Sequence, residues 1–476
     1  MSKFYITTAI DYVNSSPHLG YALEKAQADV IARYQRILFG ENVFFLTGAD
    51  EHGIKIVRSA EAAERGVKDF TDANVKKFKE LAEKLNISND YFIRTSDKKR
   101  HWLGAQALWK KMAETGDIYK SKYEGYYCVG CEAYVTEKDL IGGKCPDHDK
   151  EPEKIEEENY FFKLSKYAKE IELRIKNDEL RIFPESRKNE VLAMIGRGVE
   201  DISFSRPAEK LKNWGVPVPG DESQLMYVWC DALANYVSAL GYGSSDDKNF
   251  KKFWPADLHV IGKDILRFHS IIWPAMLLSA GLELPKTLFV HGHILSGGKK
   301  MSKTLGNVIN PFDLINEYGA DAVRYYLLRE ITPFDDGDIT PEKFKEAYNA
   351  NLANGLGNLT SRIMKMSENY LSFQLSAFSS QKFPEDYKKF MNNFELSKAM
   401  DLIWQKISEL DSKIQETQPF KLIKTDEKKA KEILQELVVG LNDVAEMLKP
   451  FLPQTSEKII TAIKENKMPE PLFLRK

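Results

Sequence analysis

The N-terminal residues constrain the fold most strongly, because they predict a strand, a tight turn and a helix in direct succession. Residues 3–8 are apolar and β-branched enough for a buried strand. Further on, apolar residues recur at helical spacing among polar ones, at Leu23, Val30, Tyr34 and Leu38. In the turn between them, Ser16 suits the position that caps a helix and Pro17 suits its first turn. The sequence therefore predicts that an α/β unit opens the chain.

The turn at residues 15–21 is a candidate phosphate-binding site. A helix that starts directly after a strand presents free backbone N–H groups and a positive dipole end, where phosphate binds. His18 adds a side-chain donor, and Gly20 lets a ligand approach the backbone closely. The alternative is a capped helix start without a ligand.

A second motif lies almost three hundred residues later, where residues 300–304 are Lys-Met-Ser-Lys-Thr. Gly297 and Gly298 precede this run and Gly306 follows it, which predicts a loop with hinges on both sides. Two lysines, Lys300 and Lys303, could close on a polyphosphate and stabilise the charge that develops on leaving pyrophosphate. The alternative is a solvated basic turn.

Three further apolar runs, at residues 43–47, 258–262 and 287–293, predict strands of the same sheet. Asp50 follows the first of these, at the edge where open α/β sheets bind ligands. The sequence leaves open whether Asp50 caps a helix or binds a substrate. The runs fall into two groups, so the sheet is predicted to be split by an insertion.

The insertion contains a candidate metal site. Cys128 and Cys131 are followed by Cys145 and His148, each pair separated by two residues, with two glycines between the pairs. Three thiols and one imidazole at this spacing are typical of a tetrahedral zinc site with a structural role. All four coordination positions come from the protein, which argues against a catalytic metal.

Beyond about residue 341 the pattern becomes entirely helical. Two core stripes repeat at three and four residues: Ile403, Ile407, Leu410 and Ile414, then Leu434, Leu437, Leu441, Val444 and Leu448. Pro450 is predicted to end the second helix. These stripes predict a helical bundle and say nothing by themselves about function.

Composition excludes several classes of protein. The 476 residues are 43% hydrophobic and 29% charged with a net charge of −2, which describes a multi-domain globular protein without a global affinity for nucleic acid. The N-terminus has no signal or transit segment, and the longest apolar stretch is too short to cross a bilayer. We therefore expect a cytoplasmic protein with no membrane partner. No Ser/His/Asp or Cys/His nucleophile arrangement is recognisable.

The two motifs together resemble the signatures of class I aminoacyl-tRNA synthetases, His-x-Gly-His and Lys-Met-Ser-Lys-Ser. Here they are His18-Leu19-Gly20-Tyr21 and Lys300-Met301-Ser302-Lys303-Thr304, in the family order. Both depart at the last residue. Threonine keeps the hydroxyl, whereas Tyr21 replaces a histidine with a longer donor.

Within that class the chain resembles the methionyl-tRNA synthetases nearly end to end. The resemblance includes residues 214–219, 227–232, 262–265 and 268–269, and the Cys/His knuckle. It implies an α/β, Rossmann-like split parallel sheet with a zinc-knuckle insertion, followed by an all-α bundle. The implied parts are residues 1–112 and 226–285 for the catalytic domain, 113–225 for the insertion, 286–340 for the linker with the lysine loop, and 341–476 for the anticodon-binding domain.

The resemblance also implies the residues of the active site. Those implied for methionine are Ile10, Tyr12, Asp50 (for the ammonium group), Trp229, Leu233, Tyr236, Phe268 and His269. Those implied for ATP and the adenylate are His18, Gly20, Tyr21, Lys263, Asp264, Lys300 and Lys303, of which His18, Tyr21, Lys300 and Lys303 are the catalytic set. Aromatic and apolar walls suit a thioether, which a donor on Tyr236 or His269 could recognise. Core packing is the alternative for Trp229 and Tyr236.

The implied activity is methionine–tRNA ligation: ATP activates methionine to methionyl-adenylate, and the product is transferred to the 3′ end of tRNA(Met). The implied cofactors are one structural Zn²⁺ per chain and Mg²⁺ with ATP. The insertion is too short for the editing domain that valine, isoleucine or leucine would need, because one methylene gives only about 1–3 kcal/mol of discrimination. The alternatives are a class I synthetase for another amino acid and a non-catalytic tRNA-binding paralogue. Small nucleotidylyltransferases share the first motif but lack the knuckle and the helical tail.

For the anticodon, the resemblance nominates Asn358, Arg362 and Phe420. Specific RNA recognition usually stacks splayed bases on aromatic rings. The family has Pro-Trp where this chain has Pro419-Phe420, so a smaller ring is expected to stack; an anchor in the core is the alternative for Phe420. We expect a monomer, because no appended C-terminal dimerisation module is recognisable.

Overall fold

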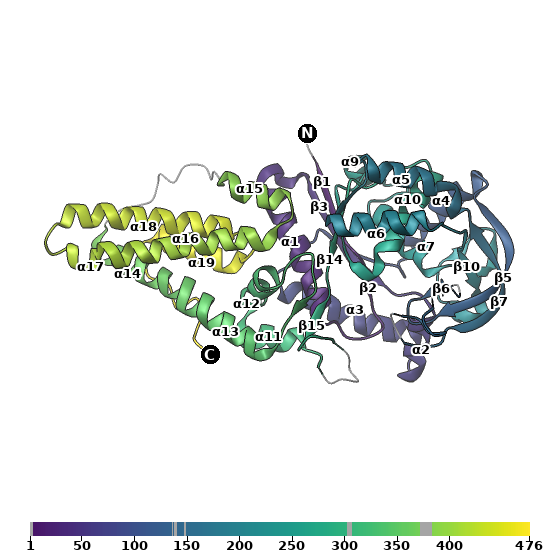
Figure 1. The fold of residues 1–476 in the computed structure, drawn as a ribbon, viewed down its shortest axis with the longest axis horizontal. Helices are drawn as coiled ribbons and strands as arrows, with labels where there is room; N and C mark the ends of the chain where they lie inside the picture. Colours follow the sequence, from purple (N-terminus) through teal and green to yellow (C-terminus); the bar gives the residue numbers. More distant parts are fainter. Residues whose placement is uncertain (1–2, 136, 138–139, 147–148, 302–306, 372–382) are drawn as a thin grey trace. The chain divides into compact units, whose positions relative to one another are not determined.

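The computed structural model describes residues 3–476 except 136, 138–139, 147–148, 302–306 and 372–382. The chain forms two compact units. Unit 1 comprises Met1–Pro17, Phe39–Glu80 and Ser88–His291, and unit 2 comprises His18–Leu38, Leu81–Ile87 and Gly292–Lys476. Each unit therefore contains segments from distant parts of the sequence (Figure 1).

A seven-stranded sheet of parallel neighbours is the centre of unit 1. Its strands run in the order β2-β3-β1-β13-β14-β8, and β4 also pairs with β3. The bounds are β1 Phe4–Thr8, β2 Asp11–Tyr12, β3 Val43–Asp50, β4 Tyr91–Arg94, β8 Arg181–Phe183, β13 Leu258–Gly262 and β14 Thr287–His291. The predicted split sheet is confirmed, since β1 and β3 precede the insertion and β13 and β14 follow it.

The order of the strands indicates at which edge of the central sheet a ligand is expected to bind. From β1 the chain moves to β3 on one side, whereas β13 pairs with β1 on the other side, with Ile6 opposite Leu258. Open α/β sheets whose strand order reverses at such a point bind ligands beyond the carboxyl ends of the two central strands. All five residues of β13 and of β14 are buried, as expected for strands covered on both faces.

The insertion contributes more than a knuckle. Its three-residue strand β8 pairs with β14 and forms one edge of the central sheet, which the sequence did not predict. A separate antiparallel sheet runs in the order β6-β5-β7-β9, with bounds β5 Ile118–Cys128, β6 Ala133–Val135, β7 Glu153–Phe162 and β9 Ile202–Ser203. A third sheet combines β10 Ser205–Pro207, β11 Pro217–Val218 and β12 Asp221–Met226.

The helices of unit 1 pack around these sheets, and many of its buried residues, from Tyr5 to Val290, belong to a common core cluster. They are α2 Ile54–Ala62, α3 Val67–Lys84 (whose last turn belongs to unit 2), α4 His101–Glu114, α5 Ala168–Lys176, α6 Glu185–Gly196, α7 Val228–Leu233, α8 Asn235–Ser238, α9 Lys248–Phe253 and α10 Trp273–Ser279. A π-helical turn, Phe268–Ile272, precedes α10. Such turns are frequent at functional sites.

Unit 2 begins with α1, Leu19–Phe39. The predicted capping by Ser16 is wrong, because α1 starts two residues after Pro17 and His18 stands at its N-terminus. A small sheet pairs β15 Ile294–Ser296 with β16 Lys299–Lys300 and with β17 Gly337–Asp338. The helices α11 Pro311–Tyr318 and α12 Ala320–Tyr325, with the π-helical turn Tyr326–Glu330, lie between these strands in the chain.

The C-terminal region is helical, as predicted. It contains α13 Pro341–Ala347, a π-helical segment Tyr348–Gly357, α14 Asn358–Tyr370, α15 Glu385–Asn392, α16 Leu396–Thr417, α17 Pro419–Leu422, α18 Glu427–Leu448 and α19 Pro453–Glu465. The long helices α16, α18 and α19 lie side by side in Figure 1. The two predicted stripes are buried except for Leu410, which is partly exposed, and α18 ends before Pro450.

A fully buried arginine connects distant segments of unit 2. Arg324 is 0% exposed and its guanidinium lies 2.7 Å from the Asp29 carboxylate of α1. It also donates to the carbonyl oxygens of Leu85, Pro450 and Phe451 at 3.2, 3.0 and 2.7 Å. Such a group is stable in the interior because its charge is paired and its N–H groups are hydrogen-bonded. Within the described part of the chain, no helix is both long enough and apolar enough to span a bilayer.

Candidate active site

Two short strands bring the first predicted methionine residues together. β2 pairs with β3 so that Tyr12 lies opposite Asp50, the last residue of β3. Ile10 precedes β2, and its Cγ2 lies 2.9 Å from where a Cβ on Gly48 would stand. Glycine is required at position 48 mainly by the backbone oxygen of Ile93, only 2.4 Å from the same point, and it also makes room for Ile10. These three residues meet at the carboxyl edge that the strand order identifies.

An aromatic group forms a second part of this region. The Trp229 ring of α7 stacks on Phe268, with 3.7 Å between centroids and 9° between planes. His269 meets Trp229 edge to face, with centroids 6.3 Å apart, and Leu233 is buried one turn further along α7. The indole N–H of Trp229 is buried and has no acceptor among the described residues. An orphaned buried donor of this kind is available to a ligand.

The hydrogen bonds of Tyr236 and His269 fix the protons of this pair. His269 Nδ1 lies 3.0 Å from the carbonyl oxygen of Ile265, which can only accept, so Nδ1 carries a proton. In the neutral ring Nε2 is then an acceptor, and it receives the Tyr236 hydroxyl proton at 2.7 Å. Both protons that we expected to be available for a sulfur atom are thus engaged with protein acceptors.

The surroundings of Asp50 disfavour the ionised form of its carboxyl group. Burial raises its pKa well above the ordinary range, and the nearby Asp231 carboxylate raises it further, against a hydrogen bond from the His52 backbone N–H. Thr95 Oγ1 lies 3.5 Å from the same carboxylate oxygen. A cation that binds here removes this penalty, which suits the ammonium group that the sequence assigns to Asp50.

A buried carboxylate between two histidines is a feature that sequence reasoning missed. Asp231 Oδ2 lies 2.5 Å from His52 Nδ1, and its Oδ1 lies 2.6 Å from His101 Nε2. Burial raises the pKa of Asp231, but the charge of His52 and the hydrogen bonds of both histidines outweigh this and the pKa lies below its ordinary value. Asp231 therefore stays ionised, immobilises His52 next to Asp50, and adds negative charge to the site. Its only sequence signal was its place in the 227–232 stretch.

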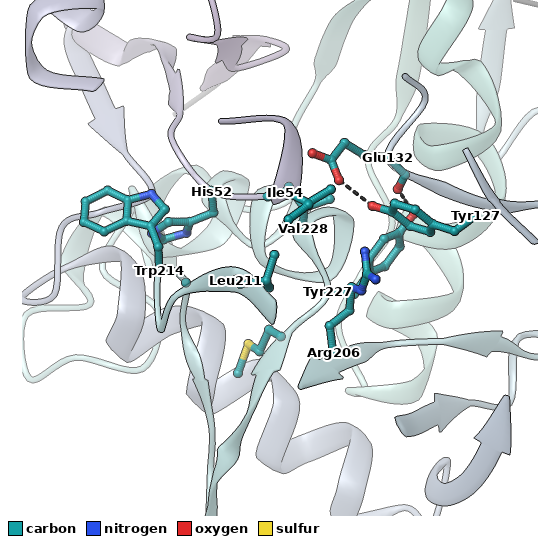
Figure 2. A pocket seen from close by; sticks show the side chains of 12 residues that line it. His52, Ile54, Tyr127, Glu132, Arg206, Leu211, Trp214, Tyr227 and Val228 are labelled. Atoms are coloured by element: carbon teal, nitrogen blue, oxygen red, sulfur yellow. Dashed lines mark hydrogen bonds between the residues drawn. The ribbon is translucent and has the colours of Figure 1, made fainter. Parts of the chain in front are cut away.

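The pocket in Figure 2 lies next to Tyr12, because Gly53, one of its lining residues, packs closely against the Tyr12 hydroxyl. It is lined by residues that come from β3–α2, the knuckle and the segment before α7: His52, Gly53, Ile54, Tyr127, Glu132, Arg206, Leu211, Trp214, Gly215, Met226, Tyr227 and Val228. Glu132, which the sequence did not nominate, accepts a hydrogen bond from Tyr12 Oη at 2.6 Å.

The knuckle brings its three cysteines together. The sulfur atoms of Cys128, Cys131 and Cys145 all lie within 4.8 Å of one another, and Cys131 and Cys145 are 3.5 Å apart. Burial raises the pKa of the Cys131 thiol, and the neighbouring Cys145 raises it further. The fourth predicted ligand, His148, lies outside the described residues. The thiols thus have the clustering that a metal ion requires.

Lys263 and Asp264 follow β13 directly, in a short 3₁₀ turn, Lys263–Ile265. A Cβ on Gly262 would lie 2.7 Å from Asp264 Oδ1, so a side chain at position 262 would displace the Asp264 carboxylate. Both residues thus stand at the carboxyl edge of the central sheet.

In unit 2, the first motif forms the start of α1. The Gly20 backbone N–H donates to His18 Nδ1 at 3.1 Å, so in a neutral His18 ring the proton is on Nε2. The ring of His18 also lies against that of Tyr21, with centroids 4.3 Å apart. A Cβ on Gly20 would be only 2.9 Å from the His18 ring. The observed position of the His18 ring therefore favours glycine at position 20, independently of any ligand.

The second motif begins in a hairpin. Lys300 is the last residue of β16 and pairs with Leu295 of β15. Gly297 and Gly298 form the two-residue turn, both with positive φ, +62° and +71°, and the Gly298 N–H donates to Asp338 at 2.8 Å. The expected role of these glycines as hinges is therefore replaced by that of a tight hairpin turn. Lys303, Thr304 and Gly306 lie outside the described residues.

The predicted anticodon residues occupy one face of the bundle. Asn358 and Arg362 are one turn apart on α14, and Arg362 pairs with Asp411 of α16. Arg362 and Phe420 line one hollow with Ser361, Lys365, Met366 and Ile414. Phe420 is 44% exposed, so a core anchor does not describe it. An exposed ring beside cationic side chains suits the stacking of a base.

The fold and these sites define a class of protein, which comparison with known families specifies. A family model described as tRNA synthetases class I (M) matches residues 4–154 and 148–364. The chain is 45% identical to a methionine–tRNA ligase of Clostridium acetobutylicum, over 97% of the chain and 73% of that relative. It is 42% identical to one of Thermotoga maritima, over 98% of the chain and 76% of that relative.

Solved structures agree. A Mycobacterium tuberculosis methionyl-tRNA synthetase in complex with methionyl-adenylate superposes with a TM-score of 0.89 at 35% identity, covering 97% of this chain and 93% of that one. The free-state form from the same organism superposes with a TM-score of 0.82 at 32% identity, covering 100% of this chain and 98% of that one. The chain belongs to the methionyl-tRNA synthetase family, and the family resemblance of the sequence is confirmed.

Proposed function

We propose that this chain is a methionine–tRNA ligase, which activates methionine with ATP and transfers it to the 3′ end of tRNA(Met). The observation that supports this most directly is a pair of features in unit 1. An aromatic pair, Trp229 stacked on Phe268, and a buried carboxylate, Asp50, occur in a chain 45% identical to a ligase of that name. Aromatic rings suit a thioether, and a buried carboxylate suits an ammonium group.

In the first step the methionine carboxylate attacks the α-phosphate of ATP, forming methionyl-adenylate and releasing pyrophosphate. Asp50 binds the ammonium group, and Ile10, Tyr12, Trp229, Leu233, Tyr236, Phe268 and His269 enclose the side chain. Lys263 and Asp264 bind the adenylate. No enzyme nucleophile is required, because the reacting groups belong to the substrates and the chain orients them.

The phosphates are assigned to unit 2. His18 donates from Nε2, since its Nδ1 accepts from the Gly20 N–H. Tyr21 donates its hydroxyl, and Lys300 and Lys303 neutralise charge on the β- and γ-phosphates. Mg²⁺ would accompany ATP, held mostly by the phosphates themselves. In the second step the 2′-OH of the terminal ribose attacks the acyl carbon of methionyl-adenylate, the acyl–phosphate bond breaks, and AMP and the hydroxyl proton are released.

The knuckle is proposed to hold one structural Zn²⁺. The clustered sulfur atoms of Cys128, Cys131 and Cys145 fit such an ion, with His148 as the fourth ligand. When bound, zinc would cross-link the knuckle and take no part in the reaction.

The helical region is proposed to bind the CAU anticodon, with Phe420 stacking on a base and Asn358 and Arg362 bonding to base edges. We also propose a monomeric, cytoplasmic enzyme, with residues 1–112 and 226–285 as the catalytic domain, 113–225 as the insertion, 286–340 as the linker and 341–476 as the anticodon-binding domain. The net charge of −2 means that tRNA affinity must come from local basic groups.

Amino-acid-dependent exchange of pyrophosphate into ATP tests the function. Purified protein is assayed with methionine, leucine, isoleucine, valine and cysteine at equal concentration. Exchange with methionine alone is the expected result. Exchange that depends on a different amino acid would contradict the substrate, and no exchange by folded, zinc-loaded protein would contradict the activity and favour a tRNA-binding paralogue.

A further inference from the structure

Glu132 is a buried carboxylate in the knuckle with no role in the function above. It follows Cys131 directly, is 5% exposed, and adopts a φ of +53°, which is unusual for a residue other than glycine. A residue keeps such a conformation only when its surroundings require it. The backbone at this position turns so that the side chain enters the pocket in Figure 2.

The contacts of Glu132 connect four segments of unit 1. Its Oε1 accepts from Tyr12 Oη and from the Lys55 backbone N–H, both at 2.6 Å. Its Oε2 accepts from Tyr127 Oη, and its backbone oxygen accepts from Tyr227 Oη at 2.5 Å. The donors belong to β2, the start of α2, β5 and the residue that precedes α7.

Two of these contacts reach the proposed methionine pocket. Tyr12 is a pocket residue, and Tyr227 stands at the N-terminus of α7, two residues before Trp229. Gly53 shows how closely the first contact is packed, because a Cβ there would lie 2.6 Å from Tyr12 Oη and 2.8 Å from Glu132 Oε1. Lys55 adds a second connection by donating from Nζ to the carbonyl oxygen of Gly130 at 3.2 Å.

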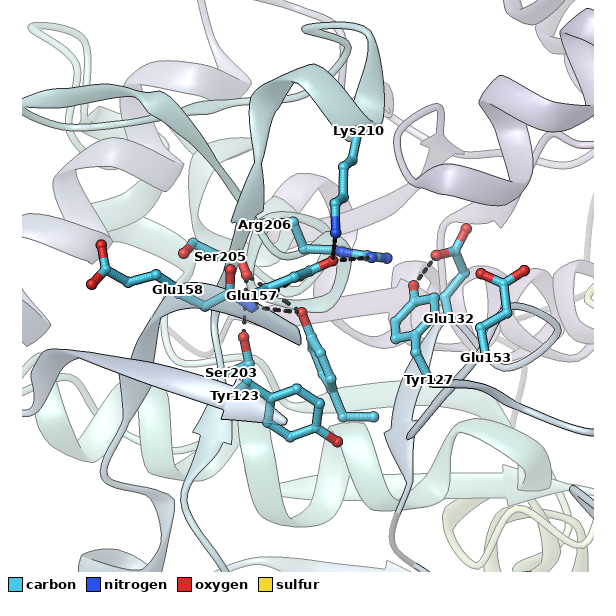
Figure 3. A network of polar contacts seen from close by, with 12 residues as sticks. Tyr123, Tyr127, Glu132, Glu153, Glu157, Glu158, Ser203, Ser205, Arg206 and Lys210 are labelled. Atoms are coloured by element: carbon cyan, nitrogen blue, oxygen red, sulfur yellow. Dashed lines mark hydrogen bonds and ion pairs between the residues drawn. The ribbon is translucent and has the colours of Figure 1, made fainter. Parts of the chain in front are cut away.

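A second layer of charge supports Glu132, as Figure 3 shows. The guanidinium of Arg206 lies 4.2 Å from the centroid of the Tyr127 ring, whose hydroxyl donates to Glu132. Arg206 in turn pairs with the buried Glu157 at 2.9 Å, and Lys210 reaches the same oxygen at 2.9 Å. Tyr127 is therefore held both by the hydrogen bond of its hydroxyl group to Glu132 and by the Arg206 guanidinium over its ring.

We propose that Glu132 is a positioning residue for methionine: its carboxylate fixes Tyr12, while its backbone oxygen holds Tyr227 at the start of α7, so that methionine affinity depends on the integrity of the knuckle. This inference rests on the proposed function, since it requires that Tyr12 and Trp229 bind methionine. Without the carboxylate, the buried Tyr12 hydroxyl and Lys55 N–H lose their acceptor, and restoring hydrogen bonds requires the pocket wall to move. Burial and the charge of Glu132 raise the pKa of Tyr12, so its hydroxyl remains a donor.

Equilibrium binding of methionine, followed by tryptophan fluorescence, and the steady-state constants of exchange test this inference. For Glu132→Ala we expect the dissociation constant and KM for methionine to rise about tenfold or more, since charged hydrogen bonds are lost. The KM for ATP, kcat and the zinc content are expected to stay within about twofold of wild type. Glu132→Gln keeps one acceptor oxygen and should recover most of the affinity.

Glu153→Gln is the matched control, because Glu153 is a half-exposed acid of the same insertion that pairs with Arg58. It should leave methionine binding unchanged. Unchanged methionine affinity in Glu132→Ala overturns the inference, as does an equal loss for methionine and ATP or a loss of zinc. If Glu132→Ala does not fold, it is replaced by Tyr12→Phe, which removes the hydroxyl group that donates to Glu132, and an unchanged methionine affinity in that variant overturns the inference. A wild-type protein that binds no methionine would instead overturn the proposed function as well.

Discussion

Asp50 illustrates how a single residue can favour ligand binding over stability. Burial and the neighbouring charge of Asp231 raise its pKa, so protonation favours the folded state relative to the unfolded chain. Asp50 costs no stability at pH values below its unfolded pKa. The cost appears as the pH rises above that value and is complete once the pH has passed through the raised folded pKa.

Asp50→Asn should therefore raise the melting temperature of the ligand-free protein at neutral pH and weaken the binding of methionine. Methionine affinity is expected to fall by more than about thirtyfold, because a buried charge partner is lost. Differential scanning calorimetry and fluorescence titration measure the two effects. Asp221→Asn is the opposite control: hydrogen bonds from Ser223 and Lys120 lower the pKa of Asp221 to about 2, so its substitution should lower the melting temperature and leave methionine affinity intact.

Gly20→Ala tests the assigned geometry of His18. The added Cβ would stand 2.9 Å from the imidazole, so the ring must move, whereas alanine itself favours the helix. We expect adenylate formation in a single turnover to slow by about tenfold to a hundredfold, as for a displaced catalytic group, without a fall in melting temperature. Gly196→Ala, at the open end of α6, should change neither quantity appreciably. An unaltered rate in Gly20→Ala would remove His18 from the phosphate site.

The individual site residues that could be predicted from the sequence were those that belong to family motifs. The residues nominated by resemblance meet in contacts such as Trp229 with Phe268 and Tyr236 with His269. Glu132 and Asp231, two buried acidic residues that the sequence did not nominate, belong to no spacing pattern. Their importance comes from partners 120 and 130 residues away in the chain, Tyr12 and His101, and only the fold creates those pairs.

Among the elements, α14 and α17 provide a test of RNA binding. Phe420 is exposed beside Arg362 and Lys365, so Phe420→Ala should lower kcat/KM for tRNA(Met) by about five- to 150-fold, the value of one stacked base. Exchange with methionine should be unaffected. Val439→Ala, which truncates a residue of similar exposure, 40%, on α18, should leave both reactions unchanged. An equal loss in the two variants would contradict stacking at Phe420.

The knuckle offers a test of the metal. Cys131→Ser should reduce bound zinc from one per chain to well below that and lower the melting temperature, because a structural site loses a ligand. Cys230 is buried outside the cluster, and Cys230→Ser should retain the zinc. Metal analysis by mass spectrometry together with calorimetry distinguishes the two variants. Equal zinc content in Cys131→Ser and wild type would disprove the assignment.

Elements with strong periodicity were predictable, and elements defined by distant partners were not. The runs at 258–262 and 287–293 gave β13 and β14, the second ending two residues before its run does, because both faces of each strand are buried. β8 has only three residues, one of them an exposed arginine, and it is a strand because β14 offers a free edge. The start of α1 was misplaced because His18 supplies the acceptor that Ser16 was expected to supply.

For the whole of unit 2, Arg324 is the residue whose loss should matter most. Arg324→Ala removes a cationic partner of the buried Asp29 and leaves three carbonyl oxygens without the guanidinium that donates to them. We expect a loss of about 3–5 kcal/mol in the free energy of unfolding, measured with urea. Arg174→Ala, which removes an exposed ion pair, should cost less than about 1 kcal/mol. A loss that small in Arg324→Ala would contradict its central role.

The grouping of segments into units could not be predicted from the sequence. α1 lies within the first forty residues, yet it belongs to unit 2, where its Tyr34 ring packs against Phe383 and Tyr387 with centroids 5.7 and 6.1 Å apart. Composition and periodicity describe each helix separately. They contain no information about which apolar faces, hundreds of residues apart, are complementary.

The same arrangement has a consequence for synthesis on the ribosome. Asp29 emerges early, but Arg324 and the carbonyl groups of Pro450 and Phe451 are among the later residues of the chain. At about 5–20 residues per second, α1 waits roughly twenty seconds to more than a minute for these partners. During that interval its buried face is open to chaperones and to neighbouring nascent chains, so codon-dependent pauses before residue 451 should alter the yield of folded protein more than pauses after it.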